Sequence, residues 1–298
     1  MTEQPRTIER FCKGDHVVYW GDAIRVLDEH VADSTVQLIF ADPPYNIGKR
    51  FAGFIDKWPT DADYAKWCHR WLDLCVKKLT PNGTMYVMAS TQSMPYLDLY
   101  LRERMCVLSR IVWHYDSSGV QARGYFGSAY EPILFCVNDS ENYTFNAHDI
   151  LIKAKTGAER RLIDYRKSVP AMYSTDKVPG NAWYFPRVRY RMPEYENHPS
   201  QKPEALLERI VRASSNPGDT ILDPFAGTFT ASAVARRLGR STISIELQEE
   251  FVKVGLRRLQ IQDRLNGELL RPLDKKYTRR NANGRKSVST QERTLFED

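Results

Sequence analysis

Two short motifs carry residue types and spacings that could do chemistry. The first, "FADPPYNIG" at residues 40–48, places Asp42 and Tyr45 around two prolines, Pro43 and Pro44, directly after an apolar run. The prolines forbid both helix and strand pairing, so they would hold a carboxylate and an aromatic ring on a stiff hook. A carboxylate can accept hydrogen bonds and a ring can stack on a flat ligand. In open α/β sheets, ligands bind at this carboxyl end of a strand.

The second motif, "DPFAGTFT" at residues 223–230, follows the strand-like run "TILD" and precedes a helical pattern. A strand, a glycine-containing turn and a helix amino terminus let the backbone approach a ligand closely. Glu246 ends the next strand, about 20 residues beyond Gly227, which is the spacing at which an acid accepts ribose hydroxyls in such folds. The motif therefore predicts a cofactor that carries a ribose. It lacks the three glycines that a pyrophosphate favours, which counts against NAD and FAD.

The elements that must position these motifs follow the βα pattern of a parallel sheet. In the first half, strands are expected over residues 15–20, 35–40, 84–89, 110–115 and 132–137, with helices over 23–30 and 63–79. In the second half, helices are expected over 203–215 and 230–239, strands over 220–223 and 241–247, and a final helix to about residue 265. We therefore expect an α/β fold made of two halves of one sheet.

The chain divides into four parts on this reading. Residues 1–139 carry the first motif, and residues 197–265 carry the second. Between them, residues 140–196 are polar, basic and aromatic with several prolines, which indicates an inserted, substrate-facing segment. Residues 266–298 form a basic tail, poor in apolar residues, that we expect to be disordered.

Basic charge is concentrated in two places. Residues 151–191 contain ten Lys/Arg and three Asp/Glu, and residues 271–298 contain eight Lys/Arg and four Asp/Glu. Because the whole chain carries only +6, the remainder is acidic. This distribution favours a polyanionic partner over evenly spread surface charge.

Several classes are disfavoured by what the sequence lacks. The start, "MTEQPRTIER", has no apolar core of signal-peptide type, and no apolar run approaches the length of a membrane span. We therefore expect a cytoplasmic protein with no membrane contact. The five cysteines form no C-x-x-C pair, so reduced structural thiols are expected and no metal site is predicted.

Together the two motifs resemble the S-adenosylmethionine-dependent DNA amino-methyltransferases. The catalytic motif precedes the cofactor motif, a permutation that is similar to the β class, and the stretches "YEPILF", "NAWYFPRV" and "HPSQKP" add to the resemblance over most of residues 14–260. Within that class, the chain looks most like the stand-alone N6-adenine enzymes. The resemblance implies a permuted Rossmann-like methyltransferase sheet with a target-recognition segment at 140–196. The family usually has a second glycine where this chain has Phe229.

The resemblance also implies roles for individual residues. Asp42 and the Pro43 carbonyl would accept the two N–H bonds of the target amine, while Tyr45 stacks on a base flipped out of the duplex. Cofactor-binding residues would be Asp22, Ala23, Lys202, Asp223, Phe225, Gly227, Thr228, Thr230 and Glu246, with Asp22 at adenine, Glu246 at the ribose and Lys202 at the methionine carboxylate.

Double-stranded DNA is the expected partner, so the cytoplasmic protein would be associated with the nucleoid through DNA, and a homodimer is a further expectation. The predicted DNA-binding residues are Lys49, Arg50, Arg166, Lys167, Arg187 and Arg189. The first two lie in the glycine-containing segment 46–58, which could close over an extruded nucleotide.

Three alternatives remain from the residues alone. Methylation of cytosine N4 would use the same geometry, and a related enzyme could act on RNA or on protein. A DNA-binding protein with a degenerate site is a further alternative. Carbon-5 methylation of cytosine is disfavoured because it uses a nucleophilic cysteine, usually after proline, and no cysteine here follows a proline.

Overall fold

The computed structural model describes residues 7–51, 54–115, 124–155, 161–198 and 200–270. The first half contains β1 (Glu9–Lys13), β2 (His16–Trp20), α1 (Ala23–His30), β3 (Val36–Ala41), β4 (Arg50–Phe51), β5 (Phe54–Ile55), α2 (Asp61–Lys78), β6 (Leu79–Met88), α3 (Met94–Arg102), β7 (Cys106–His114) and β8 (Tyr130–Val137). The middle contains η1 (Ala147–Ile150), β9 (Ile152–Lys153), β10 (Ile163–Asp164), β11 (Ala171–Met172), β12 (Asp176–Lys177) and β13 (Ala182–Tyr184). The last part contains α5 (Glu204–Ser214), β14 (Thr220–Asp223), α6 (Thr230–Arg237), β15 (Ser241–Glu246), α7 (Glu249–Arg258), β16 (Arg264–Leu265) and β17 (Glu268–Leu269).

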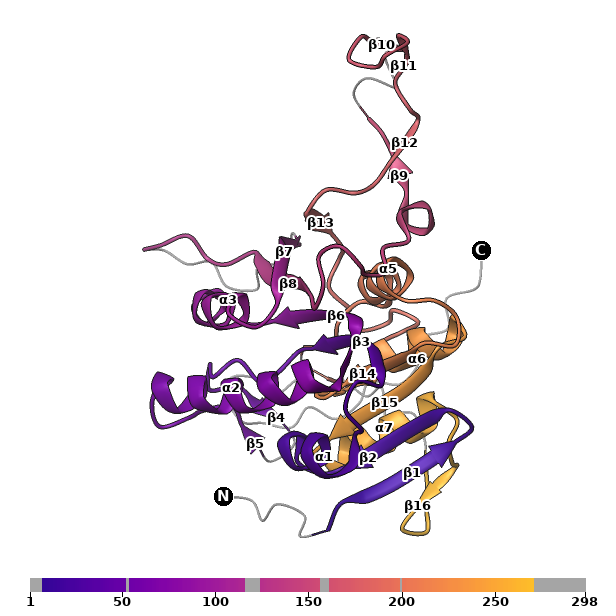
Figure 1. The fold of residues 1–298 in the computed structure, drawn as a ribbon. Coiled ribbons are helices and arrows are strands. Elements are labelled where there is room, and N and C mark those ends of the chain that lie inside the picture. Colours follow the sequence, from indigo (N-terminus) through magenta and orange to yellow (C-terminus); the bar gives the residue numbers. More distant parts are fainter. Residues whose placement is uncertain (1–6, 52–53, 116–123, 156–160, 199, 271–298) are drawn as a thin grey trace, which may run out of the picture.

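Nine of the described strands form one sheet in the order β1-β2-β15-β14-β3-β6-β8-β7-β13 (Figure 1). The centre, from β2 to β6, is parallel, whereas β8 runs antiparallel to both β6 and β7. This mixed α/β sheet confirms the expected fold class. Parallel central strands are covered on both faces, which explains why β3 is almost continuously apolar.

The strand order joins motifs that are far apart in the chain. β14 lies directly beside β3, with Ile221 opposite Leu38 and Leu222 opposite Ile39. β15 pairs with the other edge of β14, and β2 pairs with β15 so that Glu246 lies opposite Trp20. Because all four strands are parallel, the segments after β2, β3, β14 and β15 meet at one edge of the sheet.

Helices cover both faces of the sheet and bury two separate apolar layers. On one face, α1, α2 and α3 pack through buried side chains such as Leu27, Trp71 and Leu101. On the other face, α5 and α6 pack on the sheet through Ile210 and Val234, and α7 adds a third apolar cluster beside them. Helices packed on both faces therefore hold in place the edge of the sheet at which the two motifs meet. No helix of the described residues is both long and apolar enough to cross a membrane.

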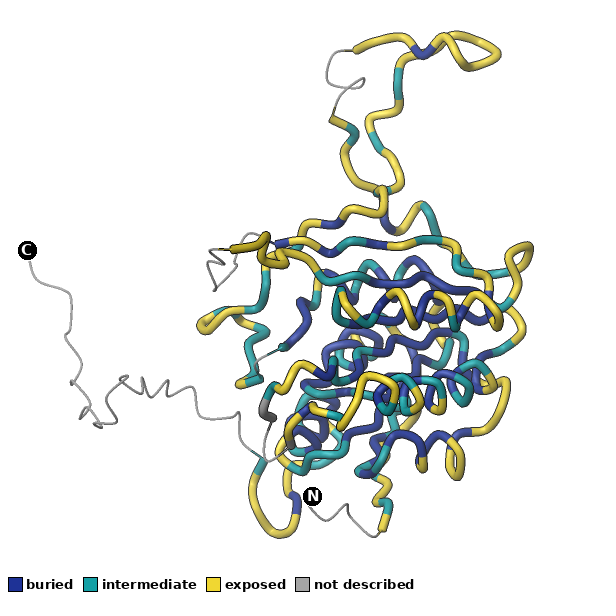
Figure 2. Tube along the Cα trace, turned by 90° about the vertical axis from the view of Figure 1, so that its left-hand side faces the viewer, coloured by how far each residue is buried: buried dark blue, intermediate teal, exposed yellow. Residues whose placement is uncertain are grey.

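Residues 151–155 and 161–178, called the arm below, project away from the sheet (Figure 1). The arm holds the small strand pairs β9–β12 and β10–β11, and most of its described residues are exposed (Figure 2). The predicted segment 140–196 is nevertheless not wholly separate, because β13 pairs in parallel with β7 and joins the main sheet.

Some element boundaries differ from the sequence prediction. The final helix, α7, ends at Arg258 rather than near residue 265, and the chain continues into the hairpin β16–β17. Leu265 and Leu270 pack with α7, so ordered chain extends beyond the predicted boundary at residue 265. The rest of the predicted tail, residues 271–298, lies outside the described residues. The sequence reading also missed β1 and α3.

Candidate active site

A cavity of about 650 Å³ opens where β2, β3, β14 and β15 end. Most of the predicted site residues line it: Asp22, Ala23, Asp42, Pro43, Pro44, Tyr45, Lys49, Arg187, Lys202, Asp223, Phe225, Gly227, Thr228, Thr230 and Glu246. The two motifs therefore share one cavity, as the strand order requires.

The remaining predicted DNA-binding residues lie elsewhere. Arg189 lines a smaller neighbouring cavity of about 210 Å³, which also includes Glu131 and Arg187. Arg166 and Lys167 belong to the arm, where the Arg166 guanidinium is paired with Asp164 at 2.9 Å. Only the backbone of Arg50 is described, in β4; its side chain lies outside the described part of the structure.

The hook, residues 42–45, is held from outside by α2 and by a neighbouring loop. The Tyr64 hydroxyl on α2 donates to the Pro44 carbonyl at 2.8 Å. Buried Asp56 accepts the Tyr45 N–H at 3.2 Å and also accepts the Lys49 N–H. Asp56 therefore ties the start of the 46–58 segment to the hook.

A buried cluster of charges surrounds the end of the hook. The Tyr45 hydroxyl lies 2.7 Å from Asp42 Oδ1 and 3.1 Å from Glu131 Oε2. The Lys202 ammonium lies 2.5 Å from Asp42 Oδ2 and 3.5 Å from Glu131 Oε2. Two carboxylates thus share one ammonium and one hydroxyl.

The protonation of this cluster follows from its burial. Burial alone would lower the pKa of Lys202, but Asp42 and Glu131 more than offset that effect and raise it above its ordinary value. Burial, followed by the Asp42 and Glu131 charges, raises the pKa of Tyr45 well above its usual range. Lys202 is therefore charged and Tyr45 remains a neutral hydroxyl at neutral pH.

Lys202 was expected at a cofactor carboxylate, and the structure gives its ammonium different partners. The side chain is 6% exposed, and its Nζ contacts Asp42, Glu131 and the Ser200 carbonyl. The expected contact with a cofactor carboxylate stays a prediction, and the three observed contacts of the ammonium would compete with it.

The opposite side of the cavity is built around Glu246. Its Oε2 accepts the Gly227 N–H at 2.8 Å, and its Oε1 accepts the Gln248 N–H at 2.7 Å. Burial raises the pKa of Glu246 to about 7 even though these backbone donors favour the charged form. A carboxylate in this position can accept further hydrogen bonds from a ligand that enters the cavity.

Other predicted cofactor residues also have defined local roles. Asp22 caps α1 by accepting the Arg25 N–H at 3.1 Å. Asp223 accepts the Phe225 N–H at 3.1 Å, and burial raises the pKa of Asp223 to about 8. The Phe225 ring packs edge-on against Trp71 at 5.1 Å between centroids, so this wall of the cavity is aromatic.

Phe229 fills the position at which the family usually has a glycine. Its φ is 59°, in the left-handed region that a bulky residue rarely adopts. The ring is fully buried against α7, where a Cβ added at Gly255 would lie 2.4 Å from it. The missing side chain of Gly255 therefore makes room for Phe229, and the turn keeps a glycine-like conformation.

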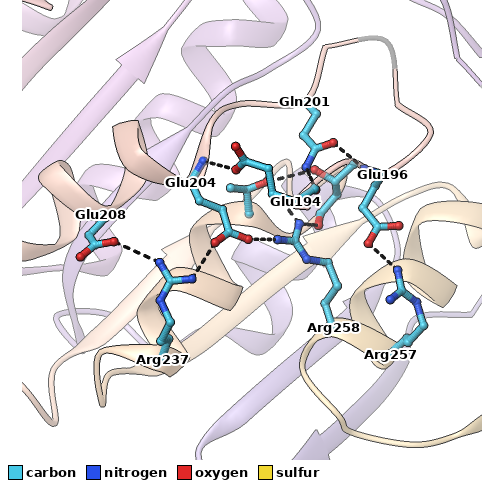
Figure 3. A network of polar contacts seen from close by, with 10 residues as sticks. Glu194, Glu196, Gln201, Glu204, Glu208, Arg237, Arg257 and Arg258 are labelled. Atoms are coloured by element: carbon cyan, nitrogen blue, oxygen red, sulfur yellow. Dashed lines mark hydrogen bonds and ion pairs between the residues drawn. The ribbon is translucent and has the colours of Figure 1, made fainter. Parts of the chain in front are cut away.

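A polar network fastens the segment before α5 to α6 and α7 (Figure 3). Arg258 donates to Glu204 and to the Thr228 carbonyl, both at 2.6 Å, and thereby links α5 to the turn at residues 223–230. Arg237 donates to Glu204 at 2.6 Å, and Gln201 donates to the Glu194 carbonyl at 2.6 Å. Gln201 precedes Lys202 directly, so the network also fixes the backbone that presents the ammonium.

Sequence reasoning missed three residues of the site. Glu131 and Tyr115 line the cavity beside the hook, and His198 lies against the Gly227 turn. Burial, then the Lys202 and Lys49 charges, lowers the pKa of His198 to about 3, so its ring is neutral. The signal for Glu131 was visible, because an acid interrupts the otherwise apolar run "YEPILF" of β8.

Comparison with known proteins identifies relatives along most of the chain. The family model described as DNA methylase matches residues 36–257. The DNA adenine methyltransferase YhdJ of Escherichia coli (strain K12) is 54% identical over 269 residues, covering 90% of this chain and 91% of that protein. The type II methyltransferase M.HpaI of Haemophilus parainfluenzae is 33% identical over 247 residues, covering 82% of this chain and 74% of that one.

Solved structures share the fold at lower identity. The cytosine-N4-specific PvuII DNA methyltransferase superposes with a TM-score of 0.64 at 17% identity, covering 88% of this chain and 93% of that one. The complex of M1.HpyAVI with S-adenosylmethionine gives a TM-score of 0.55 at 22% identity, covering 81% of this chain and 98% of that one.

Proposed function

This chain belongs to the DNA methylase family. We propose that it methylates the N6 amino group of adenine in duplex DNA, with S-adenosylmethionine as the methyl donor. The observation that carries the proposal is the shared cavity. It places the Asp42 carboxylate and the Tyr45 ring at one end and the Gly227–Glu246 contact at the other.

The cavity residues fit S-adenosylmethionine. A volume of about 650 Å³ lies within the range of small-molecule sites. Phe225, Ala226 and Phe251 give apolar lining, and Asp22 and Glu246 also line the cavity. Glu246 would accept from ribose hydroxyls, and Asp22 would accept from the adenine amine. When bound, the cofactor supplies an electrophilic methyl group on a sulfonium sulfur.

The residues of the hook would orient the amine that receives the methyl group. An exocyclic amine is a weak nucleophile because its lone pair is delocalised into the ring. Asp42 and the Pro43 carbonyl would accept its two N–H bonds and favour a pyramidal nitrogen. Positive charge then develops on nitrogen beside Asp42, so this carboxylate stabilises the transition state more than the ground state.

Adenine is favoured over cytosine by the likeness to YhdJ, whose printed name states adenine as its target. The fold alone does not separate the two, since the PvuII enzyme with the same fold is cytosine-N4-specific. Methylation of cytosine N4 is therefore the second candidate, because the same hook could orient that amine.

Access to a base amine requires the nucleotide to leave the duplex, which costs a few kcal/mol. Arg187 lies in the cavity over the Tyr115 ring at 4.5 Å, where it could contact the extruded nucleotide or its phosphate. The arm presents Arg166 and Lys167 away from the cavity, where they would contact DNA that flanks the target.

A homodimer and a cytoplasmic location also stay predictions.

Sequencing of genomic DNA tests the proposal in cells. Strains with the active gene, with the Asp42→Ala gene and without the gene would be compared by a method that detects N6-methyladenine. We expect methylated adenines in one sequence context in the first strain only. Equal methylation in all three strains would contradict the proposal.

A further inference from the structure

We propose that Glu131 is a positioning residue of the methyl transfer, which together with Lys202 holds Asp42 and Tyr45 in a single arrangement at the wall of the cavity. This inference rests on the proposed function and adds to it a residue outside both sequence motifs. Glu131 lies on β8, which is separated from β3 by β6, so its carboxylate reaches the hook from a different part of the sheet.

The Glu131 carboxylate is a junction for four side chains from four segments. It lies 3.1 Å from the Tyr45 hydroxyl, 3.5 Å from the Tyr115 hydroxyl, 3.5 Å from the Lys202 ammonium and 3.6 Å from the Arg187 guanidinium. The Glu131 side chain is only 14% exposed. A carboxylate this buried needs such donors, and in return it fixes where each of them lies.

The junction matters for catalysis because two of its donors also contact Asp42. Lys202 reaches both carboxylates with one ammonium, and Tyr45 reaches both with one hydroxyl. Without Glu131, both donors could turn wholly toward Asp42. Asp42 would then be less available to the amine that it must orient. Glu131 thus divides the donors between two acceptors.

The charges of the cluster can be changed one at a time. Asp42, Glu131 and Lys202 together carry −1, so Lys202→Met leaves −2 and Glu131→Gln leaves 0. The double variant Lys202→Met/Glu131→Gln returns to −1. The other charged or titratable groups that face the cluster are not substituted in any of these variants: Lys49, Tyr64, Arg187, Tyr45, Tyr115, His198 and Asp223. Because the single and double variants differ in the net charge of the cluster, comparing them tests the effect of that charge.

The rate profile against pH is the first readout. In Lys202→Met the two carboxylates lack their cation and retain a shared proton to higher pH. The acidic limb of the profile of kcat against pH should therefore move to higher pH by about one unit or more. The double variant should return most of that shift. Glu131→Asp keeps the charge but draws the carboxylate back from its donors. It should lower kcat without moving the acidic limb of the pH profile and with little change in KM for DNA.

Lys78→Met is the matched control. Lys78 is also a buried lysine, 5% exposed and 2.6 Å from Asp33, but it lies at the end of α2 and does not line the cavity. Its loss should reduce stability without moving the acidic limb. Any of three results would overturn the proposal. The acidic limb could lie at the wild-type pH in Lys202→Met, it could lie at the same pH in Lys202→Met and in the double variant, or Glu131→Asp could keep the wild-type kcat.

Equilibrium unfolding separates this inference from the proposed function. A double-mutant cycle over Lys202 and Glu131, measured at neutral pH without substrate, should give a coupling that makes the double variant more stable than the two single losses predict. Additive losses would overturn the pairing whatever the enzyme methylates. A clear coupling in a protein that methylates no DNA would instead contradict the proposed function and leave the pairing intact.

Discussion

The Lys202 ammonium lies 2.5 Å from the Asp42 carboxylate, although the two residues are 160 positions apart in the chain. Asp42 follows β3, and Lys202 lies just before α5. One ion pair therefore joins the two halves of the permuted sheet at the point where the reaction is expected.

Asp42→Ala should reduce methyl transfer by at least about 10²–10³-fold, the scale of losing one preorganised electrostatic contact in a transition state. Cofactor affinity should change little, because the groups assigned to the cofactor lie around Gly227 and Glu246. Single-turnover kinetics and calorimetry measure the two effects separately. Retention of substantial activity would remove Asp42 from its proposed role.

Tyr45→Phe tests whether the hydroxyl matters in addition to the stacking ring. The hydroxyl contacts Asp42 and Glu131, so its loss should cost about 1.5–3 kcal/mol, or roughly ten- to a hundredfold in kcat. Tyr45→Ala should lose more because the ring is also removed. Wild-type kcat in Tyr45→Phe would mean that the ring alone acts.

Glu246 predicts a pH dependence of cofactor affinity. Its pKa is raised to about 7, and ribose hydroxyls that donate to it would favour the ionised form. Affinity should therefore rise as pH increases from 6 to 8 and level off above the pKa. In Glu246→Gln the dependence should be lost, and affinity at pH 8 should fall about ten- to a hundredfold. Calorimetry across this range checks both; an unchanged pH dependence in the variant would contradict the assignment.

The same group makes a prediction about stability without cofactor. Because burial raises the folded-state pKa of Glu246 above its unfolded value, its contribution is fully present below pH 4.5 and is lost as pH rises through about 7. Glu246→Gln should therefore lose less stability than wild type between pH 5 and 8. Denaturant unfolding at several pH values tests this, and parallel curves for the two proteins would argue against it.

Phe229 and Gly255 should behave as a coupled pair. Gly255→Ala alone places a methyl group 2.4 Å from the Phe229 ring, and Phe229→Ala alone leaves a cavity that costs about 3–5 kcal/mol. The double variant should be more stable than the sum of both losses predicts, because the added methyl enters the vacated space. Additive losses in denaturant unfolding would show that the two side chains do not compete for space.

Much of the site was predictable because strand ends are legible in the sequence. The position of the first motif was indicated by Pro43 and Pro44 after an apolar run. The position of the second was indicated by Gly227, with Glu246 one strand later. That the motifs share one cavity follows from β14 pairing with β3, which no local pattern encodes.

The parts that were missed depend on tertiary contacts. Glu131 reads as one acid in a strand, and its four partners come from four segments that only the folded sheet brings together. The end of α7 was misplaced because Leu265 and Leu270 continue the apolar pattern, but they do so from the hairpin β16–β17 rather than from the helix. Lys202 was placed at the cofactor because its charge was known and its neighbours were not.

The chemical identity of the methylated nucleoside decides whether this protein methylates the N6 amino group of adenine. Unmethylated duplex DNA would be incubated with purified protein and isotopically labelled S-adenosylmethionine, digested to nucleosides and analysed by mass spectrometry, with Asp42→Ala as the control. We expect label in N6-methyladenine for the wild type and none for the variant. Label in N4-methylcytosine, or equal label with both proteins, would contradict it.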